Sequence, residues 1–258
     1  MIPLAGTSIP STADELAHSL TEGLRACGLA PREVTVSEGR LAIDLTGAEI
    51  SRTTRLPVGR ERIGAGPEIA DVALRAEPLL FEKAPVHLRV RLAGVTTEFA
   101  RAADGIVVLN LAQAASGSVD AHILQANLEA AVNALATEAA AKQGVQVKST
   151  QLEIEAPTSR RLVFRATVTA KAFVMTTTVK LRGEVELDAE LNARFANLAV
   201  EGEGMIAGMV EGALRPRLAE FEARTFALGA LVAGGLRVSD AALSVDDALR
   251  LHATLAGA

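Results

Sequence analysis

The stretch Val179–Leu191 reads VKLRGEVELDAEL and has the clearest periodicity in the chain. Apolar and charged residues alternate, so every second side chain points to the same face of an extended strand. One face carries Val179, Leu181, Val185 and Leu187, and the other carries Lys180, Arg182, Glu184, Glu186 and Asp188. Antiparallel sheets commonly have one face in water and one face on a core. The stretch therefore predicts an amphipathic strand of an antiparallel sheet.

The sequence on either side of this stretch predicts further strands. Val86–Leu92 also alternates, with apolar residues at even positions and His or Arg between them. The same reasoning predicts strands at Val34–Ser37, Arg40–Arg55, Ile69–Leu80, Ile106–Leu111, Val145–Glu155, Leu162–Thr178, Leu236–Val238, Ala242–Val245 and Leu249–Leu255. Pro57–Pro67, which is rich in Gly and Arg, is expected to be a loop.

Helical periodicity is expected in three places. Ser11 and Thr12 precede a helix whose Leu16, Leu20 and Leu24 share one face, and Gly28 is expected to end it. The longest predicted helix is Ser118–Gln143, and a second long one is Glu203–Phe226, kinked or split at Pro216.

Together these elements predict an α+β fold. The strands are long and have one apolar face, which must be covered. We therefore expect a strongly curved antiparallel sheet wrapped around long amphipathic helices. No composition shift marks a linker, so residues 1–10 are expected to form a flexible N-terminal tail and residues 11–258 a single domain.

Composition excludes several classes of binding protein. The 258 residues are 49% hydrophobic and carry a net charge of -5, which argues against nucleic-acid binding. There is no Trp or Tyr, so no site can stack sugars or bases on those rings. The one cysteine, Cys27, allows no internal disulfide and no multi-cysteine zinc site.

The sequence also offers no clustered catalytic or cofactor-binding motif. The four histidines are His18, His87, His122 and His252, and no two have the spacing of a metal-binding pair. No nucleophile elbow occurs, and Ala65 and Gly66 stand where a phosphate loop beginning at Gly59 needs Lys and Ser or Thr. We therefore expect a protein that is not an enzyme and has no catalytic residues, metal or cofactor.

The N-terminal sequence has no basic segment followed by an apolar run of signal-peptide length. No stretch reaches the apolar length of a membrane-spanning helix. These features predict a cytoplasmic protein, or an exported protein in its trimmed form.

Three stretches are similar to the tubular lipid-binding (TULIP) superfamily, and within it to the bacterial DUF2993-type phospholipid-binding branch. They are the predicted helix Ser118–Gln143 with VKSTQLEIEA and RRLVFRATVTAKAFV after it, then NLAVEGEGMIAGMVEGALRPRLAEF, and finally LVAGGLRVSDAALSVDDALRLHATLAG. The resemblance is one of pattern and spans residues 13–257. It implies a highly curved sheet that wraps a long helix and holds lipid between the two.

The function expected from the residues and the resemblance is non-enzymatic binding or transfer of an acyl-chain lipid in an apolar groove between sheet and helix. The expected partner is a phospholipid or fatty acid, with a membrane surface as a further candidate and nucleic acid excluded. The sequence leaves the oligomeric state open. The candidate lipid-binding residues are Leu128, Val132, Leu135, Phe164, Phe173, Met175, Met205, Met209 and Leu214.

Two alternatives remain at this point. One is a structural or protein-interaction module of the same fold, with a filled core and a sheet edge that pairs with a copy or a partner. The other is an enzyme whose site is assembled only by folding.

Overall fold

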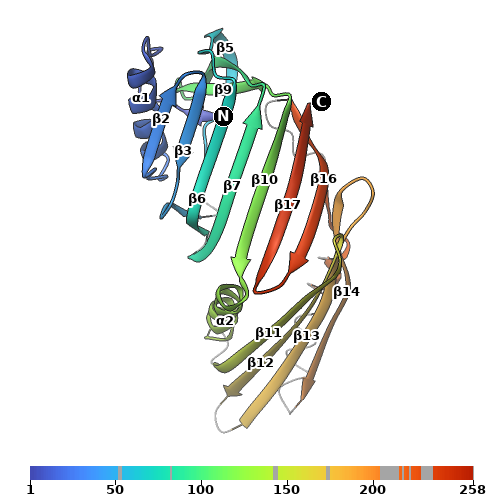
Figure 1. Cartoon of the computed structure of the whole chain (residues 1–258). Coiled ribbons are helices and arrows are strands. Elements are labelled where there is room, and N and C mark those ends of the chain that lie inside the picture. The colour runs from blue at the N-terminus through green and yellow to red at the C-terminus, as the bar shows by residue number, and fades with distance from the viewer. Residues whose placement is uncertain are drawn as a thin grey trace. The chain divides into compact units, whose positions relative to one another are not determined.

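The computed structural model describes residues 1–51, 54–81, 83–141, 145–172, 175–203, 215–216, 218–220, 222–227 and 235–257. Strands account for 60% of the described residues and helices for 16%. The expected α+β fold, with a sheet wrapped around long helices, is therefore wrong. The protein is mostly β, and its strands form three sheets (Figure 1).

Contacts within the chain divide it into two compact units. Unit 1 comprises Met1–His122, Ala230–Asp240 and His252–Ala258, and unit 2 comprises Ile123–Gly229 and Ala241–Leu251. The single domain that the sequence predicts over residues 11–258 stays a prediction. Strands β10 (Ser116–Leu124), β16 (Leu236–Val245) and β17 (Ala248–Gly257) contribute residues to both units.

Unit 1 contains most of an eight-stranded sheet. Its strand order is β16-β17-β10-β7-β6-β3-β2, and β4 also pairs with β6. Strands β3 and β4 run parallel to β6, whereas the pairs β2–β3, β6–β7 and β7–β10 are antiparallel. The strands within unit 1 are β2 (Glu33–Ser37), β3 (Arg40–Asp44), β4 (Glu49–Ile50), β6 (Asp71–Phe81) and β7 (Ala84–Ala93).

A four-stranded sheet completes unit 1. Its order is β1-β9-β8-β5, made of β1 (Ile2–Pro3), β9 (Val107–Gln113), β8 (Thr96–Ala102) and β5 (Gly59–Ala65). The loop expected at Pro57–Pro67 is thus a strand for most of its length. Gly59 permits this, because a Cβ there would lie 2.7 Å from the Ala100 Cβ atom of the paired strand.

The first helix follows the sequence prediction closely. Helix α1 (Ala13–Ala26) is capped by Thr12, whose Oγ1 accepts a hydrogen bond of 3.2 Å from the Glu15 amide. Leu16, Leu20 and Leu24 are buried, as their spacing predicts. They pack in one core with apolar residues of β3, β6, β8 and β9.

The N-terminal residues, expected to form a flexible tail, pack against α1. Ile2 and Pro3 pair with β9, and Leu4 is buried. The backbone of Pro3 comes so close to α1 that a Cβ on Gly23 would lie 2.3 Å from its carbonyl oxygen. Ser19 of α1 also holds Ala5, because the Ser19 Oγ accepts a hydrogen bond of 3.0 Å from the Ala5 amide.

Unit 2 is built on a five-stranded antiparallel sheet whose order follows the chain. It contains the stretch VKLRGEVEL within β13, so the strand predicted there is confirmed. Its strands are β11 (Gln146–Thr158), β12 (Arg161–Ala172), β13 (Met175–Leu187), β14 (Asn192–Glu203) and β15 (Thr225–Ala227).

The long helix expected at Ser118–Gln143 is shorter in the structure than predicted. Residues Ser116–Leu124 form strand β10, which pairs with β7, and helix α2 begins only at Gln125 and ends at Ala141. Of the expected helix at Glu203–Phe226, residues 204–214, 217 and 221 lie outside the described residues, whereas residues 215–216, 218–220 and 222 are helical, as predicted. At its start, Glu203 belongs to β14, and at its end Thr225 and Phe226 belong to β15. Neither α1 nor α2 is enclosed by a sheet on all sides, because each has exposed residues.

Candidate functional site

Three of the sequence-predicted site residues, Leu128, Val132 and Phe164, lie in one apolar cluster of unit 2. Leu152, Ile154, Leu162 and Ala166 are buried at its centre, on β11 and β12. Half-buried side chains surround them, and we call the whole set the apolar layer. These are Leu128 and Val132 of α2, Ala156, Phe164, Leu181 and Val185 of the sheet, and Leu243, Val245 and Leu249.

Strand alternation places the sheet residues of the apolar layer on one face. Ile154 pairs with Phe164, and Leu162 pairs with Val185, and directly paired residues of an antiparallel sheet share a face. Gly183 makes room for the Phe164 ring, because a Cβ there would lie 2.7 Å from Phe164 Cζ and 2.3 Å from Leu198 Cδ2. The Phe164 ring therefore occupies space that any side chain at position 183 would need.

Helix α2 is held at the edge strand β11 by three polar side chains one turn apart. Gln125 Nε2 donates a hydrogen bond of 3.1 Å to the Leu152 carbonyl oxygen. Glu129 Oε2 accepts one of 3.0 Å from the Leu152 amide. Asn133 Oδ1 accepts one of 2.8 Å from the Thr150 hydroxyl. These contacts fix the side of the helix that carries Leu128 and Val132 toward the apolar layer.

Of the nine sequence-predicted lipid-binding residues, the structure brings together Leu128, Val132 and Phe164. Leu135 lies in α2 and Met175 begins β13, but their side chains are not among the described ones. The remaining four, Phe173, Met205, Met209 and Leu214, lie outside the described residues. Sequence reasoning left out Leu152, Ile154 and Leu162, although the alternation in LEIEA and RRLVF marks them as one apolar face.

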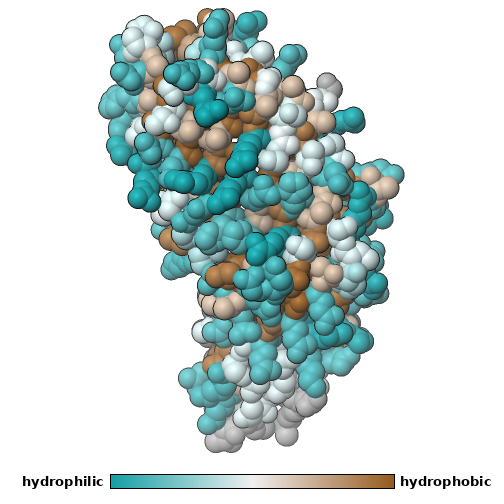
Figure 2. All heavy atoms as spheres, viewed as in Figure 1, coloured by the Kyte–Doolittle hydropathy of each residue, from teal (hydrophilic) through white to brown (hydrophobic). Residues whose placement is uncertain are grey.

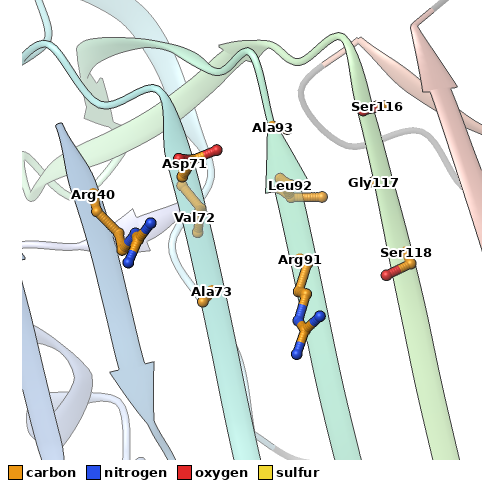
Figure 3. Close-up of a pocket in the computed structure, with 10 residues that line it drawn as sticks. All are labelled: Arg40, Asp71, Val72, Ala73, Arg91, Leu92, Ala93, Ser116, Gly117 and Ser118. Atoms are coloured by element: carbon orange, nitrogen blue, oxygen red, sulfur yellow. The ribbon is translucent and has the colours of Figure 1, made fainter.

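A second candidate site lies on the other unit and was missed from the sequence. It is a hollow of about 620 Å³ over strands β3, β6, β7 and β10 (Figure 3). We call it the arginine basin. The side chains that alternation places on its open face are Arg40, Asp71, Ala73, Arg91, Ser116 and Ser118. Val72 and Leu92 point to the opposite face, where they are buried in the core of unit 1.

Arginines further along the same sheet face have partners. The Arg75 guanidinium donates a hydrogen bond of 2.5 Å to Asp44, and Arg89 forms an ion pair with Glu77. Arg40 and Arg91, in contrast, have no ion-pair or hydrogen-bond partner among the residues that the structure describes. A neighbouring hollow contains Arg62, but that arginine pairs with Glu98 at 3.1 Å. The arginine basin therefore holds two cationic side chains on one sheet face that have no partner among the described residues.

The structure pairs His87 with His122 and His252 with Asp120, although the members of each pair are far apart in the sequence. His87 and His122 stack across β7 and β10 with their ring centroids 4.5 Å apart. His252 Nδ1 lies 2.6 Å from Asp120 Oδ1, which is on the same strand as His122. Within the described part of the chain, however, no three His, Cys, Asp or Glu side chains are placed to hold a metal ion.

Cys27, the single thiol, is half-buried at the end of α1. Burial and the nearby Asp104 carboxylate both raise the pKa of this thiol, so it stays protonated at neutral pH. A protonated thiol is a poor nucleophile. Among the described helices, none combines the length and the apolar character that crossing a bilayer requires.

Comparison with known proteins assigns no family. No protein-family model, curated protein or solved structure matches the chain. The similarity to the TULIP superfamily therefore stays a prediction, and the wrapped-sheet architecture that it implied is not found.

Proposed function

We propose that the protein binds an acyl-chain lipid in the apolar layer of unit 2 without hydrolysing it. The observation that carries the proposal is the incomplete burial of this layer. Only four of its apolar residues are buried among the described ones, while nine are half-buried around them. The main core of unit 1, in comparison, contains twenty buried residues among the described ones. Half-buried aliphatic side chains beside a helix offer a surface that an apolar chain can cover.

The chemistry of the layer suits an acyl chain. Leu128, Val132 and Phe164 have no polar atoms in their side chains, so the ligand gains its free energy from leaving water. Each methylene buried contributes about 0.8 kcal/mol. Six to eight methylenes in contact with the layer would thus supply about 5 to 6 kcal/mol. No polar anchor is needed for an affinity of this size.

The first test is to purify the full chain from cells and measure its mass under native conditions. A mass increment equal to a phospholipid or a fatty acid supports the proposal. Uptake of a fluorescent phospholipid by the delipidated protein then gives the stoichiometry. A folded protein that carries no lipid and takes up none would favour the alternative, a structural or interaction module with a filled core.

Variants of α2 connect uptake to the apolar layer. Leu128→Asp or Val132→Asp should abolish uptake, because a charge in the layer has no partner. Ala130→Asp is the matched control, since Ala130 is exposed on the same helix. Circular dichroism shows whether each variant folds. If the Asp variants unfold, Leu128→Ala should stay folded and weaken uptake several-fold, and unchanged uptake in that variant would contradict the proposal.

The same assay tests the absence of hydrolysis. Free fatty acid should not accumulate during incubation with the phospholipid. An esterase needs a nucleophile with a base within hydrogen-bond reach. Product release that disappears when His18, His87, His122 or His252 is replaced by Ala would overturn this part of the proposal.

A further inference from the structure

We propose that the arginine basin of unit 1 binds the phosphate groups of an anionic ligand. This inference is independent of the acyl-lipid proposal, because every residue that carries it lies in unit 1. Its basis is a pair of uncommitted guanidinium groups beside two serine hydroxyls, over a floor of small side chains.

The sheet register determines how these side chains lie. Arg40 on β3 is the register partner of Asp71 on β6, and Ala73, two residues further along β6, pairs with Arg91 on β7. The two arginines thus flank β6 from both sides, with Ala73 between them (Figure 3). Ser118 on β10 pairs with Arg91 and lies on the same face. An alanine at the centre leaves open space that a longer side chain would fill.

The arginines are not neutralised within the protein. Neither Arg40 nor Arg91 has an ionic partner among the described residues, although Asp71 is a register neighbour of Arg40. Both are exposed, as is the rim of the basin, so a ligand can reach them from solvent. Figure 2 shows hydrophilic side chains spread over the viewed face, with hydrophobic atoms visible between them. The net charge of the chain is -5, so anion binding here must come from this local arrangement rather than from a general attraction.

Phosphate matches these groups better than a carboxylate does. A guanidinium group binds phosphate oxygens through two parallel N–H donors, and a serine hydroxyl can donate to a third oxygen. A phosphate carries enough charge and enough oxygens to engage both arginines, whereas a single carboxylate has only two oxygens. The hollow, of about 620 Å³, has room for a phosphate and part of the molecule that carries it. The ligand is either a soluble phosphate ester or the headgroup of an anionic lipid.

The soluble arm of the test uses pyrophosphate and the full chain in a phosphate-free buffer. Isothermal titration calorimetry should give saturable binding. Arg40→Gln and Arg91→Gln should each weaken it about tenfold, the loss expected for one charge-assisted contact. Arg32→Gln removes the same charge from an exposed position outside the basin and should bind like the wild type. Asp71→Asn should tighten binding, because it removes the carboxylate of the basin.

The membrane arm uses vesicles of phosphatidylcholine with and without phosphatidic acid. Cosedimentation that requires phosphatidic acid and is lost in Arg40→Gln and Arg91→Gln identifies a lipid headgroup as the source. Pyrophosphate binding without cosedimentation identifies a soluble phosphate ester. The inference is overturned if neither probe binds, or if the Arg40 and Arg91 variants behave like Arg32→Gln in both arms. Leu128→Ala, in unit 2, should leave pyrophosphate binding unchanged, which separates a failure here from a failure of acyl-lipid binding.

Discussion

Asp44, at the end of β3, illustrates how one carboxylate stabilises the local structure of unit 1. Its side chain accepts hydrogen bonds from the Thr46 amide at 2.9 Å and from Arg75 Nη2 at 2.5 Å. Burial by itself would raise the pKa of Asp44, but the hydrogen bonds from Thr46 and Arg75 outweigh it and lower the pKa to about 2. The ionised carboxylate therefore fixes the turn after β3 to the neighbouring strand β6.

The pKa of Asp44 predicts how stability depends on pH. Because the pKa is lower in the folded than in the unfolded state, the ionised group stabilises the fold above about pH 4, and this contribution is lost as the pH falls toward 2. Asp44→Asn should lower the free energy of unfolding at pH 7 by about 1 to 2 kcal/mol and flatten its pH dependence between pH 4 and pH 2. Urea denaturation at several pH values measures both effects.

Glu61 provides the control for this experiment. It is exposed on β5, and its side chain has no hydrogen-bond partner among the described residues. Glu61→Gln should leave the pH dependence as it is in the wild type. An Asp44→Asn variant with an unchanged pH profile would show that Asp44 does not stabilise the fold in this way.

At the scale of elements, α2 protects a sheet edge. Strand β11 lies at one end of its sheet, where unpaired backbone groups can recruit a strand from another molecule. The side chains of Gln125 and Glu129 form hydrogen bonds with the carbonyl oxygen and the amide of Leu152. Asn133 accepts a hydrogen bond from the hydroxyl of Thr150 on the same strand. The polar side of the helix thus takes the place of a further strand.

Removing this protection should promote association between molecules. The triple variant Gln125→Ala, Glu129→Ala, Asn133→Ala keeps good helix formers in α2 but leaves the backbone groups of Leu152 without partners. We expect faster formation of thioflavin-positive aggregates on mild heating. Thr137→Ala, an exposed change on the same helix, is the control. Equal aggregation rates for the triple variant and the control would contradict the edge-protection role.

The elements also show what the sequence could predict. Period-two alternation was sufficient for β7 and β13, and the leucine spacing was sufficient for α1, because each of these faces a single core. The strand β10 was mistaken for the start of a helix, since Val119, Ile123 and Leu124 also fit helical spacing. Only pairing with β7, a contact distant in sequence, decides between the two. The strand β5 was missed because Gly59 and Arg residues are typical of loops, and its partner β8 follows only after β6 and β7.

At the scale of the whole molecule, the main core of unit 1 and the apolar layer of unit 2 differ in how completely their side chains are buried. In unit 1, Leu41, Val107 and Leu109 are 0% exposed. In unit 2 the best-buried apolar side chains of the layer, such as Ala166 and Leu152, remain 5% and 7% exposed. Local opening costs less free energy where fewer apolar contacts must break.

Hydrogen exchange measured by mass spectrometry should detect this difference. Peptides covering β3 and β9 should exchange at least about ten times more slowly than peptides covering β12. Adding a bound acyl lipid should slow exchange in β12 but not in β3. Slower exchange in β12 than in β9 for the ligand-free protein would contradict the burial argument.

The candidate sites were predictable only in part, because they combine residues that are distant in the sequence. Leu128, Val132 and Phe164 could be chosen as apolar residues on amphipathic elements, without knowing that they meet. The arginine basin could not be found, because Arg40, Arg91 and Ser118 lie on three strands whose order in the sheet does not follow the chain. Whether an arginine forms an ion pair depends on residues of the neighbouring strands, and the local sequence around the arginine does not show which residues these are.

Unit 1 is assembled from chain segments on both sides of unit 2, and this has a consequence for synthesis on the ribosome. Leu236 and Leu255, which pack in or against the core of unit 1, are made after nearly all of unit 2. Domains usually fold in the order in which they emerge. In this chain, every buried residue of the main unit 1 core except Leu236 lies between Leu4 and Ala114, so these residues can pack before unit 2 is made. The apolar layer of unit 2 includes Leu243, Val245 and Leu249, so it is completed only when the last two strands emerge. Nascent chains stalled before residue 236 should therefore bind a chaperone through β11–β14 rather than through their N-terminal half.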